Sequence, residues 1–238
     1  AQAQLNCGSG AAPGADTQCN TDGLTETQMF GAITLFAPEN GTTTFTSTVG
    51  QSVSNTQIRT LTGSGAGRIE LNVGGHLGRG LDFSAHDGGL RLTVQAAGEQ
   101  PGGLALATST LGSGDDQLVV DSGGILTLRD NYPINQAVGE VSAIQIDFGG
   151  GTNLMVNRGV TVVGDARVPD TPQTFDNGSG PSYARAITLA QLGRFENEGE
   201  LIMGGVITSP SFRLSSSVID SRNLPALEGY SPVGQCAV

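Results

Sequence analysis

The chain has 238 residues, a formal net charge of −11 at pH 7, and 11 basic residues, all of which are arginines. These arginines form no cluster, so the composition argues against nucleic acid and against an anionic membrane surface as partners. Charged residues make up 14% of the chain, too few for the highly charged kind of disorder, while 37 glycines suit a protein with many tight corners.

Residues 1–28 are expected to form an N-terminal loop that serves as a cap or as an assembly segment. The opening residues, AQAQ, resemble what a signal peptidase leaves behind a small residue, which predicts an extracellular or bacterial cell-surface location after signal-peptide removal. A disulfide between Cys7 and Cys19 would stabilise this segment by about 3 kcal/mol. Three free thiols in a cytosolic protein are the alternative. The odd cysteine, Cys236, is a candidate for an intermolecular bond.

Residues 29–219 are predicted to consist of short strands joined by glycine-rich corners. The part from 29 to 62 is rich in threonine and alternates polar with apolar residues, which predicts three strands. Further runs of Val, Ile and Leu predict strands at 68–73, 81–83, 90–94, 104–108, 117–120, 125–129, 141–148, 153–156, 160–163, 200–203, 206–208 and 212–219. Residues 165–182 are rich in Pro, Asp, Asn and Gly and are expected to form an exposed loop, and 220–238 a C-terminal tail.

The spacing of these strands indicates a solenoid. Apolar pairs begin near Ile69, Leu90, Leu118 and Ile144, at intervals of about 20–30 residues, which is typical of repeat folds. Each unit is too thin to bury its own apolar face, so units must stack with parallel strands one above another. We therefore predict an all-β fold, a parallel β-helix (β-solenoid) with glycine-cornered rungs.

Five residues are expected to form inward-pointing, nearly fully buried columns of this core ladder: Leu92, Leu118, Ile125, Leu154 and Val160. A β-sandwich of short strands is the alternative. Glycine corners inside the units, the absence of Trp and insertions that lengthen single turns argue against that alternative.

Two segments, GSGDDQLVVDSGGILTL and RFENEGELIMGGVI, resemble rungs of the right-handed parallel β-helix of autotransporter passenger domains. In that family, glycine-cornered segments of the GDD-x-L-x-V and F-x-N-x-G-x-L types repeat along a surface-exposed stalk. The resemblance covers residues 68–208 and implies a secreted or surface β-solenoid. The first sixty residues carry little of the repeat.

A calcium site is only weakly indicated. The pattern of calcium-binding nonapeptide repeats fits Gly112, Gly114 and Asp116, but the first glycine of the pattern is missing. Calcium in such folds is shared between consecutive turns and needs tandem copies, whereas this chain has one. Asp115 and Asp116 are therefore a weak calcium candidate, and no metal or cofactor is expected.

Catalytic residues are not assigned. Paired carboxylates cleave polysaccharides, and six aspartates could converge along one face of a solenoid: Asp82, Asp87, Asp115, Asp116, Asp121 and Asp130. However, the chain has no Trp, no Lys and only 5% aromatic residues with which to hold a sugar, so no enzyme is expected. The two histidines, His76 and His86, are expected to be polar surface groups at corners or loops.

Without an assigned catalytic or metal site, the function has to be inferred from the predicted solenoid and its two terminal rungs. Terminal rungs of a solenoid present unpaired backbone groups, which are capped or recruit another chain. No run approaches the roughly 18 apolar residues of a membrane span, so no membrane insertion is expected. We expect a secreted or cell-surface structural protein that self-associates into a homo-oligomer or filament with an adhesive or matrix role. The alternative is an extracellular polysaccharide-binding or -cleaving β-helix protein, with a cell-surface or polysaccharide ligand.

Overall fold

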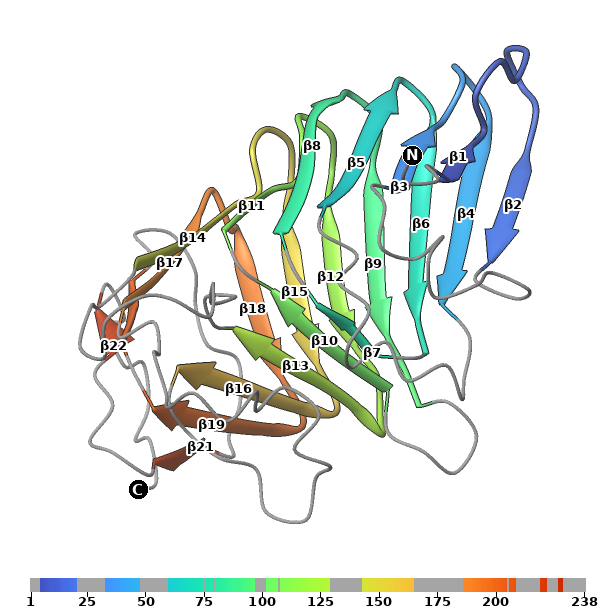
Figure 1. Cartoon of the computed structure of the whole chain (residues 1–238). Helices are drawn as coiled ribbons and strands as arrows, with labels where there is room; N and C mark the ends of the chain where they lie inside the picture. Colours follow the sequence, from blue (N-terminus) through green and yellow to red (C-terminus); the bar gives the residue numbers. More distant parts are fainter. Residues whose placement is uncertain are drawn as a thin grey trace, which may run out of the picture.

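The computed structural model describes residues 5–20, 33–47, 60–74, 76–78, 80–96, 102–106, 108–128, 143–164, 186–204, 206–208, 219–221 and 227–228. Within these residues the regular elements are all β-strands, and each strand pairs with its neighbours in parallel. The predicted all-β parallel β-helix is confirmed. Figure 1 shows the strands stacked one behind another, from the blue N-terminal strands to the red C-terminal strands.

The described strands form three sheets, here called A, B and C. Sheet A contains, in spatial order, β1 (Leu5–Cys7), β3 (Ile33–Phe36), β5 (Thr60–Gly65), β8 (Gly80–His86), β11 (Ser109–Thr110), β14 (Ala143–Asp147), β17 (Ala186–Ala190), β20 (Val206–Thr208) and β22 (Leu227–Glu228). Sheet B contains β2 (Thr17–Asn20), β4 (Thr42–Ser47), β6 (Arg68–Val73), β9 (Leu90–Val94), β12 (Gln117–Val120), β15 (Leu154–Asn157) and β18 (Arg194–Asn197). Sheet C contains β7 (His76–Gly78), β10 (Gly102–Leu106), β13 (Gly124–Leu128), β16 (Val160–Gly164), β19 (Glu200–Gly204) and β21 (Ile219–Ser221).

One rung is one passage of the chain through sheets A, B and C, as in β11, β12 and β13. The rungs lengthen along the chain: stacked residues are 26 apart from Leu90 to Asp116, 37 apart from Asp116 to Asn153, and 40 apart from Asn157 to Asn197. The predicted interval of about 20–30 residues is therefore too short for the later rungs. In the chain, the additional residues fall between β13 and β14 and between β16 and β17.

The core is built from columns in which equivalent residues of successive rungs lie on top of one another. One column runs through sheet B and is fully buried along its length: Phe45, Leu71, Leu92, Leu118, Met155 and Phe195. Because the strands are parallel and in register, each apolar side chain meets the same position of the next rung. No rung could bury these side chains alone, so their burial depends on stacking.

The predicted core ladder is correct for Leu92 and Leu118 and wrong for Ile125, Leu154 and Val160. The latter three are half-exposed, because they lie on the outer side of β13, β15 and β16. Successive residues of a strand point to opposite faces, so an error of one residue exchanges inside for outside. In place of the predicted side chains, the neighbouring Leu126, Met155 and Thr161 point inward and are fully buried.

Both ends of the chain contribute more strand than the sequence predicted. In the segment expected to be a loop, β1 pairs with β3 and β2 pairs with β4, so the N-terminal residues form part of the stack. In the segment expected to be a tail, β22 pairs with β20. Cys236, the predicted loop at 165–182 and most of the predicted strand at 212–219 lie outside the described residues.

Candidate functional site

A disulfide joins the first two strands. Cys7 of β1 and Cys19 of β2 are bonded, with their Cα atoms 6.1 Å apart. This separation is within the roughly 4.4–6.8 Å that disulfides span, and the predicted pairing is confirmed. Since β1 and β2 are the outermost described strands of sheets A and B, the bond links the two sheets at their N-terminal end. Such bonds are typical of proteins that fold in an oxidising environment.

The weak calcium candidate, Asp115 and Asp116, lies where the chain passes from sheet A to sheet B, hereafter the A–B corner. In the rung of β11 and β12 this corner consists of residues 111–116. Asp115 is exposed, and its Oδ1 accepts a hydrogen bond from the backbone N–H of Thr152 at 2.6 Å. Asp116 is fully buried, and its Oδ1 accepts a hydrogen bond from the N–H of Leu90 at 2.9 Å. One carboxylate is therefore outside and the other inside, each bonded to the backbone of a neighbouring rung. Among the described residues, no three His, Cys, Asp or Glu side chains gather as metal ligands, so the pair gains no further ligand.

Asp116 is an unusual carboxyl group. Its pKa is raised to about 7, mainly by burial and in smaller part by the nearby charge of Asp115, while the hydrogen bond from Leu90 acts in the opposite direction. The second oxygen, Oδ2, is buried and has no hydrogen-bond partner. A protonated carboxyl group removes the charge from this buried site, so the environment favours the neutral acid below pH 7.

Asn153 occupies the same corner one rung further on. Its Oδ1 accepts a hydrogen bond from the N–H of Asp116 at 3.0 Å, as Asp116 itself accepts one from Leu90. Its Nδ2 donates to the carbonyl oxygens of Gly150 and Gln191, at 2.9 and 3.0 Å. Asn153 thus satisfies buried backbone groups of both neighbouring rungs. The sequence reasoning missed it, although an Asn placed like Asp116 before a strand was a usable signal.

The aspartates that could have formed a catalytic pair lie in different surroundings. Asp82 lies on the outer face of sheet A, where two hydrogen bonds from Ser84 hold its pKa below the usual range. Asp87 lies at the A–B corner, one rung before Asp115 and Asp116, whereas Asp121 follows β12 at the opposite end of sheet B. Asp130 lies outside the described residues. The A–B corner thus places three of the six carboxylates in neighbouring rungs, and each accepts a hydrogen bond from a different donor: Ser113 for Asp87, Thr152 for Asp115 and Leu90 for Asp116.

The prediction that both histidines are surface groups is wrong for His86. This residue is fully buried, and its Nε2 lies 2.8 Å from the carbonyl oxygen of Gly67, to which it donates. Its ring meets that of Phe83 edge to face at a centroid distance of 6.0 Å. Burial lowers the pKa of the imidazole, so the ring is neutral at pH 7 and forms part of the core. His76 begins β7 in sheet C.

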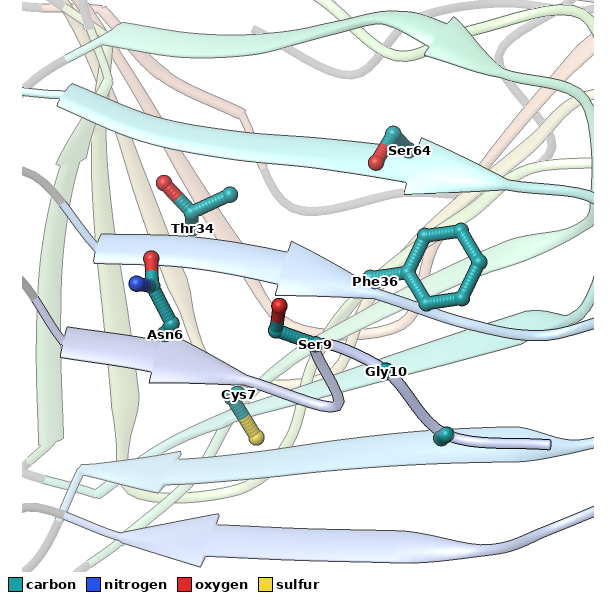
Figure 2. Close-up of a pocket in the computed structure, with 8 residues that line it drawn as sticks. Asn6, Cys7, Ser9, Gly10, Thr34, Phe36 and Ser64 are labelled. Carbon is teal, nitrogen blue, oxygen red and sulfur yellow. The ribbon is translucent and has the colours of Figure 1, made fainter.

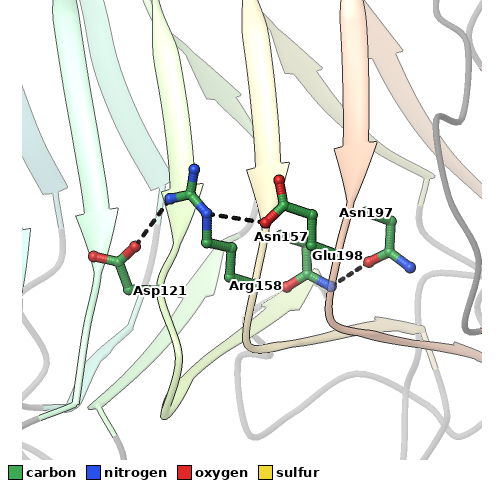
Figure 3. A network of polar contacts seen from close by, with 5 residues as sticks. All are labelled: Asp121, Asn157, Arg158, Asn197 and Glu198. Atoms are coloured by element: carbon green, nitrogen blue, oxygen red, sulfur yellow. Dashed lines mark hydrogen bonds and ion pairs between the residues drawn. The ribbon is translucent and has the colours of Figure 1, made fainter.

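The corner between sheets B and C, hereafter the B–C corner, carries two layers of polar contacts (Figure 3). On the outside, the Arg158 guanidinium contacts Asp121 in the preceding rung at 3.4 Å and Glu198 in the following rung at 3.3 Å. Inside, Asn157 Nδ2 donates to Asn197 Oδ1 at 2.7 Å and to the carbonyl oxygen of Glu200 at 2.8 Å. The recurring Asn-x-Gly at the same place in two rungs was a sequence signal for this corner.

A hollow of about 450 Å³ lies on the outer face of sheet A near the disulfide (Figure 2). Side chains from β1, β3 and β5 line it together with the loop that follows β1: Asn6, Ser9, Thr34, Phe36 and Ser64. In Figure 2, Asn6 and Cys7 lie on opposite sides of β1, so the hollow is outside the core and the disulfide is beneath it. No sequence motif marked this site, because its lining combines the first rung with single residues or pairs from the next two: Thr34 and Phe36 of β3 and Ser64 of β5.

None of the described residues forms a helix that is long and apolar enough to cross a membrane. Comparisons of the chain with protein-family models, with curated proteins and with solved structures gave no match.

Proposed function

We propose that this chain is a secreted or cell-surface structural β-solenoid that self-associates end to end into a filament or surface assembly with an adhesive or matrix role. The observation that carries the proposal is the stacking of parallel strands into three sheets, each of which has an outermost described strand at either end of the stack. An outermost strand has one backbone edge with no further described strand beside it. Such an edge is a template for a strand of another chain.

The N-terminal end offers the clearest such edge. None of the four residues of β2 is fully buried, in contrast to the inward-facing residues of β4 beside it. The disulfide holds β1 and β2 together, so this end is a defined surface. If copies add head to tail, each contact repeats the same heterologous interface, and a rotation that does not close produces a filament.

The use of the polar residues supports a structural role. Asp116, Asn153 and Asn157 direct their buried polar atoms to backbone groups of neighbouring rungs. Side chains bound in this way maintain the stack and are not available to a substrate. The disulfide supports an extracellular setting, and the resemblance of two rungs to autotransporter passengers supports the bacterial cell surface as the location.

The proposal is tested by following the size of the full chain by sedimentation velocity and negative-stain imaging over a wide range of concentration. Gln18→Lys places a charge on β2, where lysine on an edge strand opposes pairing. Gln117→Lys is the matched control, because both glutamines face outward in the same register column of sheet B and β12 is an interior strand. We expect the assemblies of the unmodified chain to become larger as its concentration rises. Gln18→Lys should prevent this increase in size, and Gln117→Lys should not.

A chain that remains monomeric at the highest concentrations would contradict self-association. Equal effects of the two lysine substitutions would show that assembly, if it occurs, does not use the edge of β2.

A further inference from the structure

We propose that the hollow on the outer face of sheet A binds a neutral polysaccharide, with one sugar ring stacked on Phe36. The inference names a ligand class for the adhesive role and rests on the proposed function only in that respect. Binding by a single copy requires no self-association, so the two proposals have separate tests.

Phe36 differs from the other aromatic residues of the described part of the chain. Phe45, Phe83, Phe148 and Phe195 are fully buried, whereas Phe36 is partly exposed and lines the hollow. Burial of an aromatic ring is favourable, so the part of this ring that remains exposed on a polar face can contact a ligand. Sugar rings present C–H groups on one face and stack on such aromatic rings.

The ring packs beside the next rung, and the backbone at Phe36 is hydrogen-bonded. A Cβ atom on Gly65 would lie 3.1 Å from Phe36 Cε2, so the ring rests directly against this glycine. The carbonyl oxygen of Phe36 accepts a hydrogen bond from Thr43 Oγ1 at 2.6 Å. The next residue, Ala37, donates its N–H to the carbonyl oxygen of Ser64 at 3.0 Å. The hollow is therefore formed before a ligand arrives, which lowers the entropic cost of binding.

The groups around the ring are polar and neutral. Asn6, Thr34 and Ser64 present an amide and two hydroxyl groups to the hollow, and Ser9 adds a third hydroxyl (Figure 2). None of the described lining residues carries a charge. The lining has no cationic side chain that would favour a phosphate or carboxylate ligand, and no carboxylate that would favour a metal ion. An aromatic face among hydroxyl and amide groups instead fits a neutral carbohydrate.

The surroundings of the hollow favour a chain of sugars over a single one. A volume of about 450 Å³ lies in the range of small-molecule sites and has room for a short oligosaccharide. From the hollow, one outward column of polar side chains continues across sheet A, one residue to a strand: Asn6, Thr34, Thr62, Asp82, Thr110 and Asp147. Neighbouring strands are about 4.8 Å apart, close to the length of one sugar unit in an extended glycan. A glycan lying along the solenoid axis would thus meet a polar group at each rung.

The test is calorimetric titration of the full chain, at a dilution where sedimentation shows monomers, with cellohexaose, chitohexaose, laminarihexaose and maltohexaose, and with polygalacturonate as the acidic probe. At least one neutral oligosaccharide is expected to bind. Phe36→Ala should weaken that binding about tenfold or more, since it removes the stacking face. Phe36→Tyr retains an aromatic face and should stay within about threefold of the unmodified chain.

Two controls separate loss of the site from loss of the fold. Gln117→Ala changes a partly exposed polar residue on sheet B and should leave binding unchanged. Circular dichroism of Phe36→Ala should show the same strand content as the unmodified chain, with at most a modestly lower melting temperature, because Phe36 lies outside the buried core and loses only its packing on Gly65.

Absence of binding by all four neutral oligosaccharides at millimolar concentrations would overturn the proposal. So would unchanged binding by Phe36→Ala, or polygalacturonate binding that depends equally on Phe36. If Phe36→Ala instead prevented self-association while no sugar bound, the hollow would be the seat of a second copy and the carbohydrate proposal would be wrong. A monomeric chain that binds sugar would contradict self-association alone, and a polymer that binds none would contradict only this inference.

Discussion

Asp116 and Asn153 show how single polar residues adapt to the interior of a stacked fold. Both lie at the A–B corner, and both accept a hydrogen bond from the backbone N–H of the preceding rung. Asn153 has an amide that donates to two carbonyl oxygens, whereas the corresponding Oδ2 of Asp116 has no partner. The difference between an amide and a carboxyl group therefore makes the stability of the protein depend on pH.

We predict that Asp116 makes the fold more stable in mild acid than at neutral pH. Its pKa is about 7 in the folded chain against an ordinary value of 3.8, so the folded state binds the proton more tightly. The stabilisation is fully present below about pH 4 and decreases by up to roughly 1.4 kcal/mol per pH unit as the pH rises towards the folded pKa. Urea unfolding at pH 5 and pH 7 should show the loss.

Asp116→Asn is the control for this prediction. It keeps the shape and the acceptor for Leu90 but does not titrate, so its stability relative to the unmodified chain should increase by about 1–3 kcal/mol from pH 5 to pH 7. His86, whose pKa is lowered by burial, acts in the opposite sense below pH 6.5 but is common to both chains. A constant difference between the two chains across this range would show that Asp116 is not the titrating group.

Two leucines in neighbouring strands, on opposite faces of sheet B, provide a second prediction. Leu118 of β12 is fully buried, and Leu154 of β15 is partly exposed. Leu118→Ala should lower the free energy of unfolding by about 2–5 kcal/mol, because it leaves a cavity in the core. Leu154→Ala should cost clearly less, since its side chain already contacts solvent. Equal losses in urea unfolding would contradict the register of β12 and β15.

At the scale of elements, the corners decide how one rung is joined to the next. At the B–C corner the two layers of contacts differ in their surroundings: Asn157 and Asn197 are fully buried, whereas the Arg158 side chain is 46% exposed. Buried hydrogen bonds leave unpaired groups behind when one partner is removed, while exposed ion pairs are replaced by water. The buried asparagines should therefore matter more to stability than the ion pairs outside them.

We predict that Asn157→Ala lowers the free energy of unfolding by about 1–3 kcal/mol, because Asn197 Oδ1 and the Glu200 carbonyl oxygen lose their shared donor. Arg158→Ala should cost at most about 1 kcal/mol, and high salt should reduce even that effect. Urea unfolding at low and high ionic strength measures both. If Arg158→Ala lowered the free energy of unfolding more than Asn157→Ala, the exposed ion pairs and not the buried asparagines would be the main stabilising contacts of this corner.

At the scale of the whole molecule, each rung contacts only its neighbours, so damage at one end should stay local. Reducing the Cys7–Cys19 bond removes a cross-link that the chain-entropy model values at about 3 kcal/mol for a loop of this size. Hydrogen exchange after reduction should accelerate in β1 and β2 and remain slow in β9, β12 and β15. A matched Cys7→Ala, Cys19→Ala variant should behave like the reduced chain. Loss of protection along all rungs would show instead that the solenoid unfolds as one cooperative unit.

Local features of the sequence predicted the class of fold and favoured the pairing of Cys7 with Cys19 over free thiols. Glycine corners, short β-branched runs and their spacing are local properties of the chain, and they sufficed to predict stacked parallel strands. The same reasoning placed Leu92 and Leu118 correctly.

Which face of each strand is inside, and which side chains meet, depends on how the rungs stack. Ile125, Leu154 and Val160 were misassigned because the side-chain period of a strand is two, and strand pairing between rungs, not local pattern, sets the register. The buried state of Asp116 and His86 depends on neighbours 19 to 37 residues away. The hollow around Phe36 likewise combines residues of three rungs, and side chains so far apart in the chain become one site only when the rungs stack.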